Sequence, residues 1–110
     1  MMADYEKRVA ALDKAAEVSM ARFGELSKYD NDSVDVEGMI GAMDAYTTAL
    51  VAAHLASRDL QRYLDARFDD GTLTEDQEKM RLIAEDRVFG NANIIDMMTK
   101  KRVMIIKVNE

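Results

Sequence analysis

Two short acidic, turn-forming segments divide the chain into three long stretches, and this division constrains the fold more than any other feature. The segments are Asp30-Asn31-Asp32-Ser33 and Asp69-Asp70-Gly71. Asp, Asn and Ser side chains compete for backbone hydrogen bonds and so end helices, while glycine suits the left-handed position that follows a helix. No proline interrupts the stretches between them. We therefore predict an all-α single helical domain over residues 1–110, with helices over about 4–29, 34–68 and 75–99.

The first stretch has one apolar face with a nearly regular spacing of four and three residues. This stripe consists of Tyr5, Val9, Leu12, Ala16, Phe23 and Leu26, with Ser19 at its one gap. Charged residues such as Lys7, Arg8 and Glu17 fall on the opposite face. Such a pattern is typical of an amphipathic helix that buries one side.

The second stretch carries two stripes, and at about 1.5 Å per residue its helix would span roughly 50 Å. The larger stripe reads Val36, Met39, Met43, Tyr46, Leu50, Ala53, Leu60 and Leu64, interrupted by Ser57. A second stripe of small residues reads Gly38, Ala42, Ala45, Ala49, Ala52 and Ala56. Alanine is also simply a good helix former. However, an ordered row of small side chains lets a second backbone approach closely. We interpret this helix as packed on two faces, either centrally in its own bundle or between protomers.

The start of the third helix has the most specific local signal in the chain. Thr74 and Gln77 have the spacing of a capping box, so this helix should begin near Glu75. The loop before it is short, which makes the second and third helices antiparallel neighbours. We therefore expect an elongated helical hairpin or an antiparallel three-helix bundle. Gly90-Asn91 interrupts the third stretch, where it would either kink the helix or create a short fourth one.

The last eleven residues differ in character from the rest. Residues 100–110 contain four basic residues and one acidic residue, in a chain whose net charge is −6. Val103, Met104, Ile105 and Ile106 are mostly β-branched, so this arm is as compatible with an extended conformation as with a helix. The cations could complement the negative end of a helix. Alternatively, the arm could dock its apolar residues in a partner's groove, with its cations against the acidic turns of a neighbouring copy.

Few residues are available for catalysis or for cofactors. The chain has no cysteine, and His54 is its single histidine. One histidine supports neither a transition-metal site of the usual kind nor a hydrolase triad. The segment Ala56–Gln61 is weakly similar to the phosphoacceptor helix of sensor-kinase dimerisation domains, yet Arg58 stands where that family has its histidine. Histidine phosphotransfer through His54 is kept as an alternative, and we expect no enzymatic activity and no cofactor.

The acidic clusters do not have the spacing of a calcium loop. Calcium loops place a glycine at the sixth position and a bidentate Glu at the twelfth. Counted from Asp30, the sixth position is Asp35. With Gly71 placed sixth, the first and twelfth positions are Ala66 and Gln77. Both clusters are better interpreted as helix ends, where acids favour the following N-terminus, and we expect no metal site.

Charge and hydropathy narrow the classes of partner. A net charge of −6 disfavours nucleic acid, because phosphate binding requires clustered cations. No run approaches the roughly 18 consecutive apolar residues of a membrane span. The N-terminal residues include Asp4 and Glu6, where a secretory signal would be basic and then apolar. We expect a cytoplasmic protein, although export without a leader fits the same sequence.

Association with other helices is the function that these features favour. Two-faced packing of the second helix and an apolar arm predict a non-enzymatic assembly protein that self-associates. The interface candidates are Gly38, Ala42, Ala45, Ala49, Ala52, Ala56, Val103, Met104, Ile105 and Ile106. The alternative is a chaperone or adaptor that binds a partner's helix. In general character the chain is similar to small needle, rod and chaperone components of bacterial secretion machines. It lacks the proline-marked turn of many needle subunits and matches no family motif.

Overall fold

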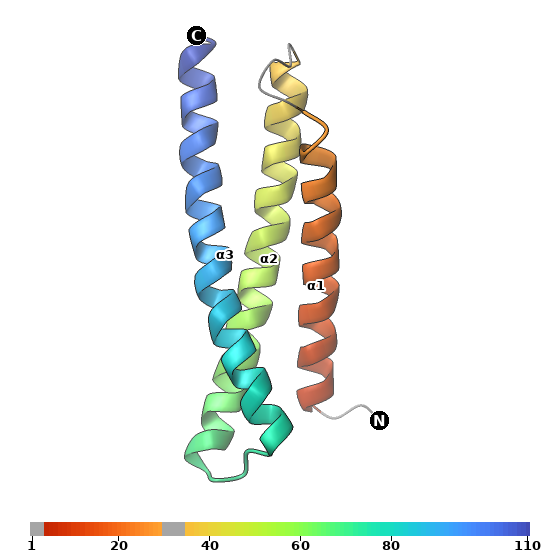
Figure 1. The fold of residues 1–110 in the computed structure, drawn as a ribbon, viewed down its shortest axis with the longest axis vertical. Coiled ribbons are helices and arrows are strands. Elements are labelled where there is room, and N and C mark those ends of the chain that lie inside the picture. Colours follow the sequence, from red (N-terminus) through yellow and green to blue (C-terminus); the bar gives the residue numbers. More distant parts are fainter. Residues whose placement is uncertain (1–3, 30–34) are drawn as a thin grey trace.

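In the computed structural model three helices run antiparallel in chain order, with the second between the other two (Figure 1). The structure describes residues 4–29 and 35–110. They form α1 (Asp4–Leu26), α2 (Val36–Asp69) and α3 (Glu75–Val108), with no strand in these ranges. α2 packs against both neighbours, whereas no Cα of α1 comes within 8 Å of one in α3 over this part of the chain. The prediction of an all-α, antiparallel three-helix bundle is confirmed, and α2 is the helix packed on two sides.

The larger stripe predicted along α2 forms the core. Met43, Tyr46, Leu50, Ala53, Leu60 and Leu64 are buried. The two serines that interrupt the stripes of α1 and α2 are buried as well, and each bonds back to its own helix. Ser57 Oγ donates to the Ala53 carbonyl at 2.8 Å, and Ser19 Oγ donates to the Ala16 carbonyl at 2.8 Å. Because both hydroxyls are satisfied locally, these gaps cost the core little.

The three helices share one fully buried cluster near the α2–α3 turn. It consists of Leu12 from α1, Leu60 and Leu64 from α2, and Ala84 from α3. Met80 of α3 packs against this cluster together with Tyr5 of α1. The start of α1 therefore lies beside the start of α3. Burial, and to a lesser extent the nearby Asp76 carboxylate, raise the pKa of Tyr5. At this end the side chains of α1 and α3 therefore meet over α2.

Ion pairs at the helix interfaces fix the register of the bundle. Arg8 Nε of α1 lies 3.2 Å from Asp59 Oδ2 of α2. Arg102 Nε of α3 lies 2.8 Å from Asp44 Oδ1 of α2. Both pairs are partly exposed and contribute little stability individually. They nevertheless specify which turns of the helices lie opposite one another.

Arg81 makes the closest of these contacts between α3 and α2. Its Nε donates to Asp65 Oδ1 at 2.7 Å, and this hydrogen bond raises the pKa of Arg81. Its guanidinium also lies 4.2 Å from the centre of the Phe68 ring. These contacts tie the first turns of α3 to the last turns of α2.

The turn between α2 and α3 has the structure that its sequence predicts. Gly71 has φ of +72°, a conformation that side chains other than glycine rarely adopt. Thr74 Oγ1 accepts a hydrogen bond from the backbone N–H of Gln77. In return, Oε1 of the Gln77 side chain accepts one from the backbone N–H of Thr74. The capping box and the helix start at Glu75 are confirmed.

Replacing Thr74 with alanine is expected to lower the free energy of unfolding by about 1 kcal/mol, because the Gln77 amide would lose its acceptor. Urea unfolding followed by circular dichroism measures this loss. Thr48, which is exposed inside α2, provides the matched control. Thr48→Ala should leave stability unchanged or raise it by a few tenths of a kcal/mol, since alanine has the higher helix propensity. An equal loss in both variants would contradict a capping role.

The third helix extends further than predicted, and Gly90 does not split it. α3 continues to Val108 without a break, so a short fourth helix after Gly90 was a wrong expectation. Gly90 lies on an exposed face, where an added Cβ would meet no atom within 4 Å. One exposed glycine costs only about 1 kcal/mol in a helix interior, which the hydrogen bonds on either side easily outweigh.

The arm of residues 100–110 is helical rather than extended. Asn109 caps α3, and its backbone N–H donates to the Ile105 and Ile106 carbonyls. β-branched residues lower helix propensity by only tenths of a kcal/mol each, so they do not end a helix that is already formed.

The bounds predicted for the other helices differ less from those of the structure. α1 ends at Leu26 rather than at residue 29. The predicted α2 start at residue 34 and the acidic segment 30–33 lie outside the described residues, and α2 begins at Val36.

Candidate functional site

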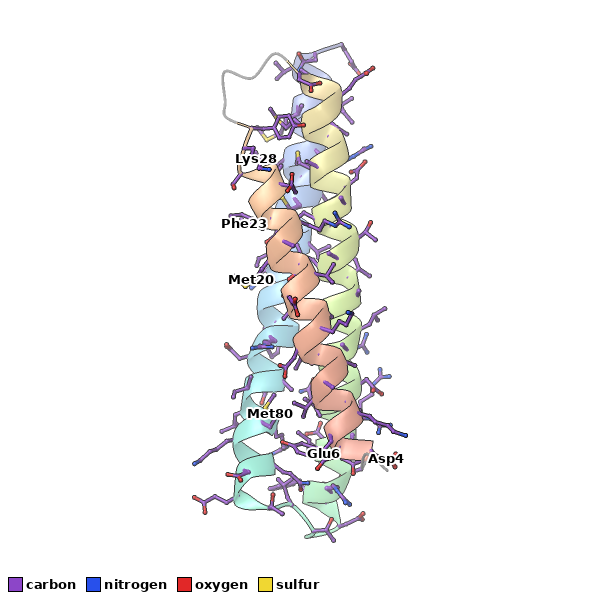
Figure 2. All side chains as sticks on the ribbon, turned by 90° about the vertical axis from the view of Figure 1, so that its right-hand side faces the viewer. Asp4, Glu6, Met20, Phe23, Lys28 and Met80 are labelled. Carbon is purple, nitrogen blue, oxygen red and sulfur yellow. The ribbon has the colours of Figure 1, made fainter. Side chains whose placement is uncertain are left out.

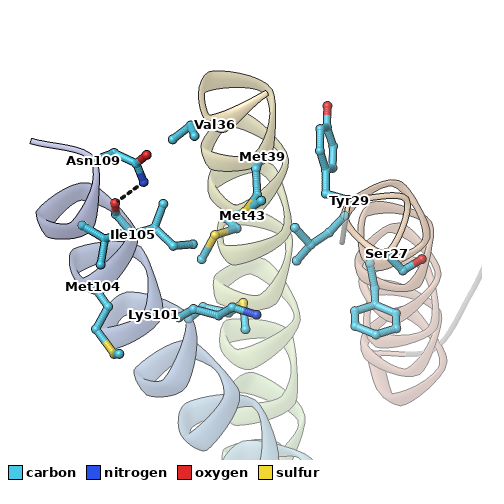
Figure 3. A pocket seen from close by; sticks show the side chains of 13 residues that line it. Ser27, Tyr29, Val36, Met39, Met43, Lys101, Met104, Ile105 and Asn109 are labelled. Carbon is cyan, nitrogen blue, oxygen red and sulfur yellow. Dashed lines mark hydrogen bonds between the residues drawn. The ribbon is translucent and has the colours of Figure 1, made fainter. Parts of the chain in front are cut away.

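An apolar groove opens at the end of the bundle where α3 finishes, opposite the buried cluster (Figure 3). It has a volume of about 590 Å³. α2 forms its floor, with Met39 and Met43 rising between the walls formed by α1 and α3. The lining residues are Phe23, Leu26, Ser27, Tyr29, Val36, Met39, Met43, Met98, Lys101, Met104, Ile105, Val108 and Asn109. This composition suits an apolar helix better than a polar small molecule.

The α1 wall extends the apolar surface toward the middle of the bundle. Met20 and Phe23 are both exposed and lie on the same side of α1 (Figure 2). The Phe23 ring centre lies 5.4 Å from that of Tyr46, which is buried in α2. A smaller hollow of about 140 Å³ between Ser19, Met20, Phe23 and Tyr46 adjoins the groove at Phe23. The exposed apolar surface is therefore continuous over at least two turns of α1.

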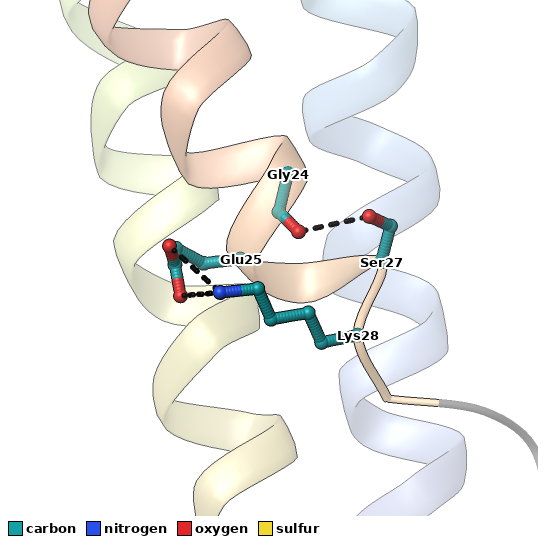
Figure 4. A network of polar contacts seen from close by, with 4 residues as sticks. All are labelled: Gly24, Glu25, Ser27 and Lys28. Carbon is teal, nitrogen blue, oxygen red and sulfur yellow. Dashed lines mark hydrogen bonds and ion pairs between the residues drawn. The ribbon is translucent and has the colours of Figure 1, made fainter.

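Polar and charged groups surround the groove rather than fill it. At the end of α1 the Lys28 ammonium lies 3.1 Å from Glu25 Oε2, and Ser27 Oγ donates to the Gly24 carbonyl at 2.8 Å (Figure 4). On α3, Lys101 is the charged residue in the lining, and the Asn109 side chain donates to the Ile105 carbonyl. An apolar centre with a charged rim is the usual composition of a protein interface.

Part of the predicted C-terminal interface lies in this groove. Met104 and Ile105 line it, with Met104 exposed and Ile105 half-buried. Val103 is exposed but lies outside the lining. Ile106 is half-buried and is also absent from the lining. Because the arm is helical, these four consecutive residues point in different directions and do not share one face.

The stripe of small residues on α2 does not form one continuous contact surface. Ala45 and Ala52 are exposed, Ala49 is buried, and Ala42 and Ala56 are half-buried. Positions 42, 49 and 56 lie on one side of this stripe, whereas positions 45 and 52 lie about 60° further around the helix, because three residues fall short of a full turn. Its members therefore lie partly against neighbouring helices and partly at the surface.

Gly38 has a local structural role at the start of α2. Its amide donates to Asp35 Oδ1 at 2.9 Å, so Asp35 caps the helix. A Cβ on Gly38 would overlap the Asp35 carboxylate and would lie 2.7 Å from Tyr29 Oη. The glycine leaves room for the cap and for the tyrosine that follows α1.

His54 is half-buried on α2 and away from the groove. Its Nδ1 is buried and has no hydrogen-bond partner among the described residues.

Across residues 4–29 and 35–110, no three histidine, cysteine, aspartate or glutamate side chains come together as a metal site would require. None of the helices in these ranges is both long enough and apolar enough to cross a membrane.

The sequence interpretation missed the α1 wall and most of the groove floor. Phe23 was assigned to the core stripe, whereas the structure leaves it exposed at the mouth of the groove. Met20 lies next to this stripe on the helix surface, and an apolar residue outside the stripe is the sequence signal that could have indicated a second contact surface on α1. A search against protein-family models, curated proteins and solved structures gave no match.

Proposed function

We propose that this protein is a non-enzymatic helical assembly protein, which self-associates by covering the groove between α1 and α3. The observation that supports this function best is the groove itself: an apolar surface on three helices, with no helix of the described chain covering it. Large continuous apolar patches are uncommon on monomeric proteins and usually mark interaction sites.

The floor and walls provide the kind of contact that helices make with one another. Phe23, Met43 and Met104 present apolar side chains from three different helices toward one space. A helix in that space would contact all three helices at once. It would bury the exposed Phe23 and Met104 side chains against Met43, which is already buried. Each such side chain contributes about 1.5–3 kcal/mol when it is fully buried.

A chaperone or adaptor that binds another protein's helix is the second candidate. Four methionines line the groove: Met39, Met43, Met98 and Met104. Methionine is flexible and polarisable, and it is common on surfaces that bind several different helices. This composition favours an adaptable groove, which an adaptor would use for a client.

Light scattering after size exclusion separates the two candidates. For self-association, the mass should rise above the 12.4 kDa of one chain as the concentration increases over a hundredfold range. A mass that stays at one chain throughout this range would contradict self-association and leave the adaptor as the remaining proposal. Added salt up to 0.5 M provides a control, because apolar association persists where purely electrostatic contacts are screened.

A further inference from the structure

A second heptad stripe on α3 is exposed over most of its length. Nine positions alternate in steps of three and four residues: Met80, Ile83, Arg87, Gly90, Ile94, Met97, Lys101, Met104 and Val108. We call these nine residues the open seam. Only two of them are charged, and the rest are apolar or glycine. Such spacing over four heptads is typical of a helix that pairs with another helix.

The open seam is distinct from the face of α3 that packs on α2. That face includes Ala84 and Arg102, which contact the core cluster and Asp44 respectively. On the open seam only Met80 packs against the core cluster. Ile83, Met97, Met104 and Val108 are 44%, 59%, 65% and 82% exposed. Lys101, Met104 and Val108 also line the groove, so the seam continues the groove wall toward the middle of the bundle.

The neighbouring stripe on the outer face of α3 is a much poorer candidate for pairing. It comprises Lys79, Leu82, Asp86, Phe89, Asn93, Asp96, Lys100, Val103 and Lys107, of which only three are apolar. Leu82, Phe89 and Val103 are single exposed side chains separated by polar and charged ones. A partner helix would therefore bury more apolar surface on the open seam.

The charges of two segments, one before and in the first turn of α3 and one near its end, favour a second copy of this chain as the partner. Between Asp69 and Glu78 there are five acidic residues and no basic one. Between Lys100 and Lys107 there are four basic residues and no acidic one. These segments lie at opposite ends of the long axis (Figure 1). A copy turned end for end would bring each segment opposite its complement, whereas a parallel copy would face like charge.

The direction of the helices leads to the same arrangement. α1 and α3 run in one direction and α2 in the other, and the groove lies between α1 and α3 (Figure 1, Figure 3). An antiparallel α3 from a second copy would be antiparallel to both walls. It would complete the up-down-up-down order of a four-helix bundle around the Met43 side chain.

We infer that two copies pair through α3 in antiparallel orientation along the open seam, with the two-fold axis between Gly90 and Ile94. This inference rests on the proposed self-association and specifies its geometry. Gly90 of one copy then lies opposite Ile94 of the other, where the absence of a side chain lets the helices approach closely. Met80 lies opposite Met104, and Lys100 comes within one helical turn of Asp86.

Distances between single spin labels test this geometry in the full-length protein. The chain has no cysteine, so Asn93→Cys and Lys107→Cys each create one labelling site, and both positions are exposed. The two positions lie two heptads apart on the same side of α3, so their labels point in similar directions. In the antiparallel dimer the labels at 107 should be about 45 Å apart, from a rise of 1.5 Å over thirty residues. The labels at 93 should lie within about 20 Å, because paired helix axes are about 10 Å apart.

Each of the other possible results contradicts a different part of the proposal. Short distances at both positions would mean a parallel dimer, and long distances at both would place the interface away from α3. Either result would overturn the inferred geometry while self-association stands. A single-chain mass by light scattering, with no dipolar signal at either position, would overturn self-association as well.

Discussion

Replacing Leu60 with alanine is expected to lower the free energy of unfolding by about 3 kcal/mol, within the usual range for a fully buried leucine. Leu60 has no exposed surface and packs with Leu12, Leu64 and Ala84, so its removal leaves a cavity between all three helices. A domain of this size commonly has only about 5–15 kcal/mol of stability, so the loss is a large fraction of the total. Urea unfolding monitored by circular dichroism at a fixed protein concentration measures it.

Leu55→Ala provides the matched control, because Leu55 lies on the same helix but is 57% exposed. The same chemical change there should cost less than about 0.5 kcal/mol. If the two variants lost similar stability, the buried cluster would not be the part of the molecule that holds the helices together. A fixed concentration is necessary because self-association would add its own contribution to the measured stability.

Replacing Met104 with glutamate is expected to weaken self-association by at least about a hundredfold in the dissociation constant. The change removes an apolar contact and places a charge at the interface, which together cost about 3 kcal/mol or more. The effect counts twice in a two-fold dimer, since each copy contributes the same residue. Sedimentation equilibrium over a range of concentrations measures the constant.

A control variant at the neighbouring Val103 distinguishes the loss of a specific contact from a general effect of the added charge. Val103→Glu adds the same charge one residue away, at a side chain that is 52% exposed and lies off the open seam. Its dissociation constant should stay within about threefold of that of the unmodified protein. Both variants should keep the helical circular dichroism signal. Equal weakening in the two variants, or none in either, would contradict pairing through the open seam.

The fold could be predicted from local signals that operate within a few residues. The capping box at Thr74 and Gln77 specifies where α3 begins, and Gly71 specifies the turn before it. The stripe of α2 specifies its buried face through periodicity alone, including Ser57, whose hydroxyl is satisfied inside the helix. These features depend on backbone geometry and spacing, which the sequence states directly.

The end of α3 could not be predicted because the local tendencies there disfavour helix and are overridden by contacts distant in sequence. Gly90 and the β-branched residues after Arg102 both disfavour helix, but each by a small amount. Contacts distant in sequence outweigh them, as when Arg102 pairs with Asp44. A propensity argument contains no information about such contacts.

The groove could not be predicted from the sequence for a different reason. The interface candidates on α2 were chosen for their small size, and Met104 and Ile105 for their position in an apolar run. Whether an apolar residue such as Phe23 is buried or exposed depends on how far α3 lies from α1, and no single helix encodes that distance. The open seam has the same spacing as a core seam, so only the arrangement of the three helices shows that it lacks a partner.

The central position of α2 has a consequence for how the chain reaches its fold. Every pair of helices whose Cα atoms come within 8 Å is also consecutive in sequence, and in the described ranges α1 and α3 meet only through side chains at the buried cluster. The contacts therefore close only short loops, and such topologies fold in microseconds to milliseconds. Either hairpin, α1–α2 or α2–α3, can form first, and the remaining helix then adds to a surface that already exists.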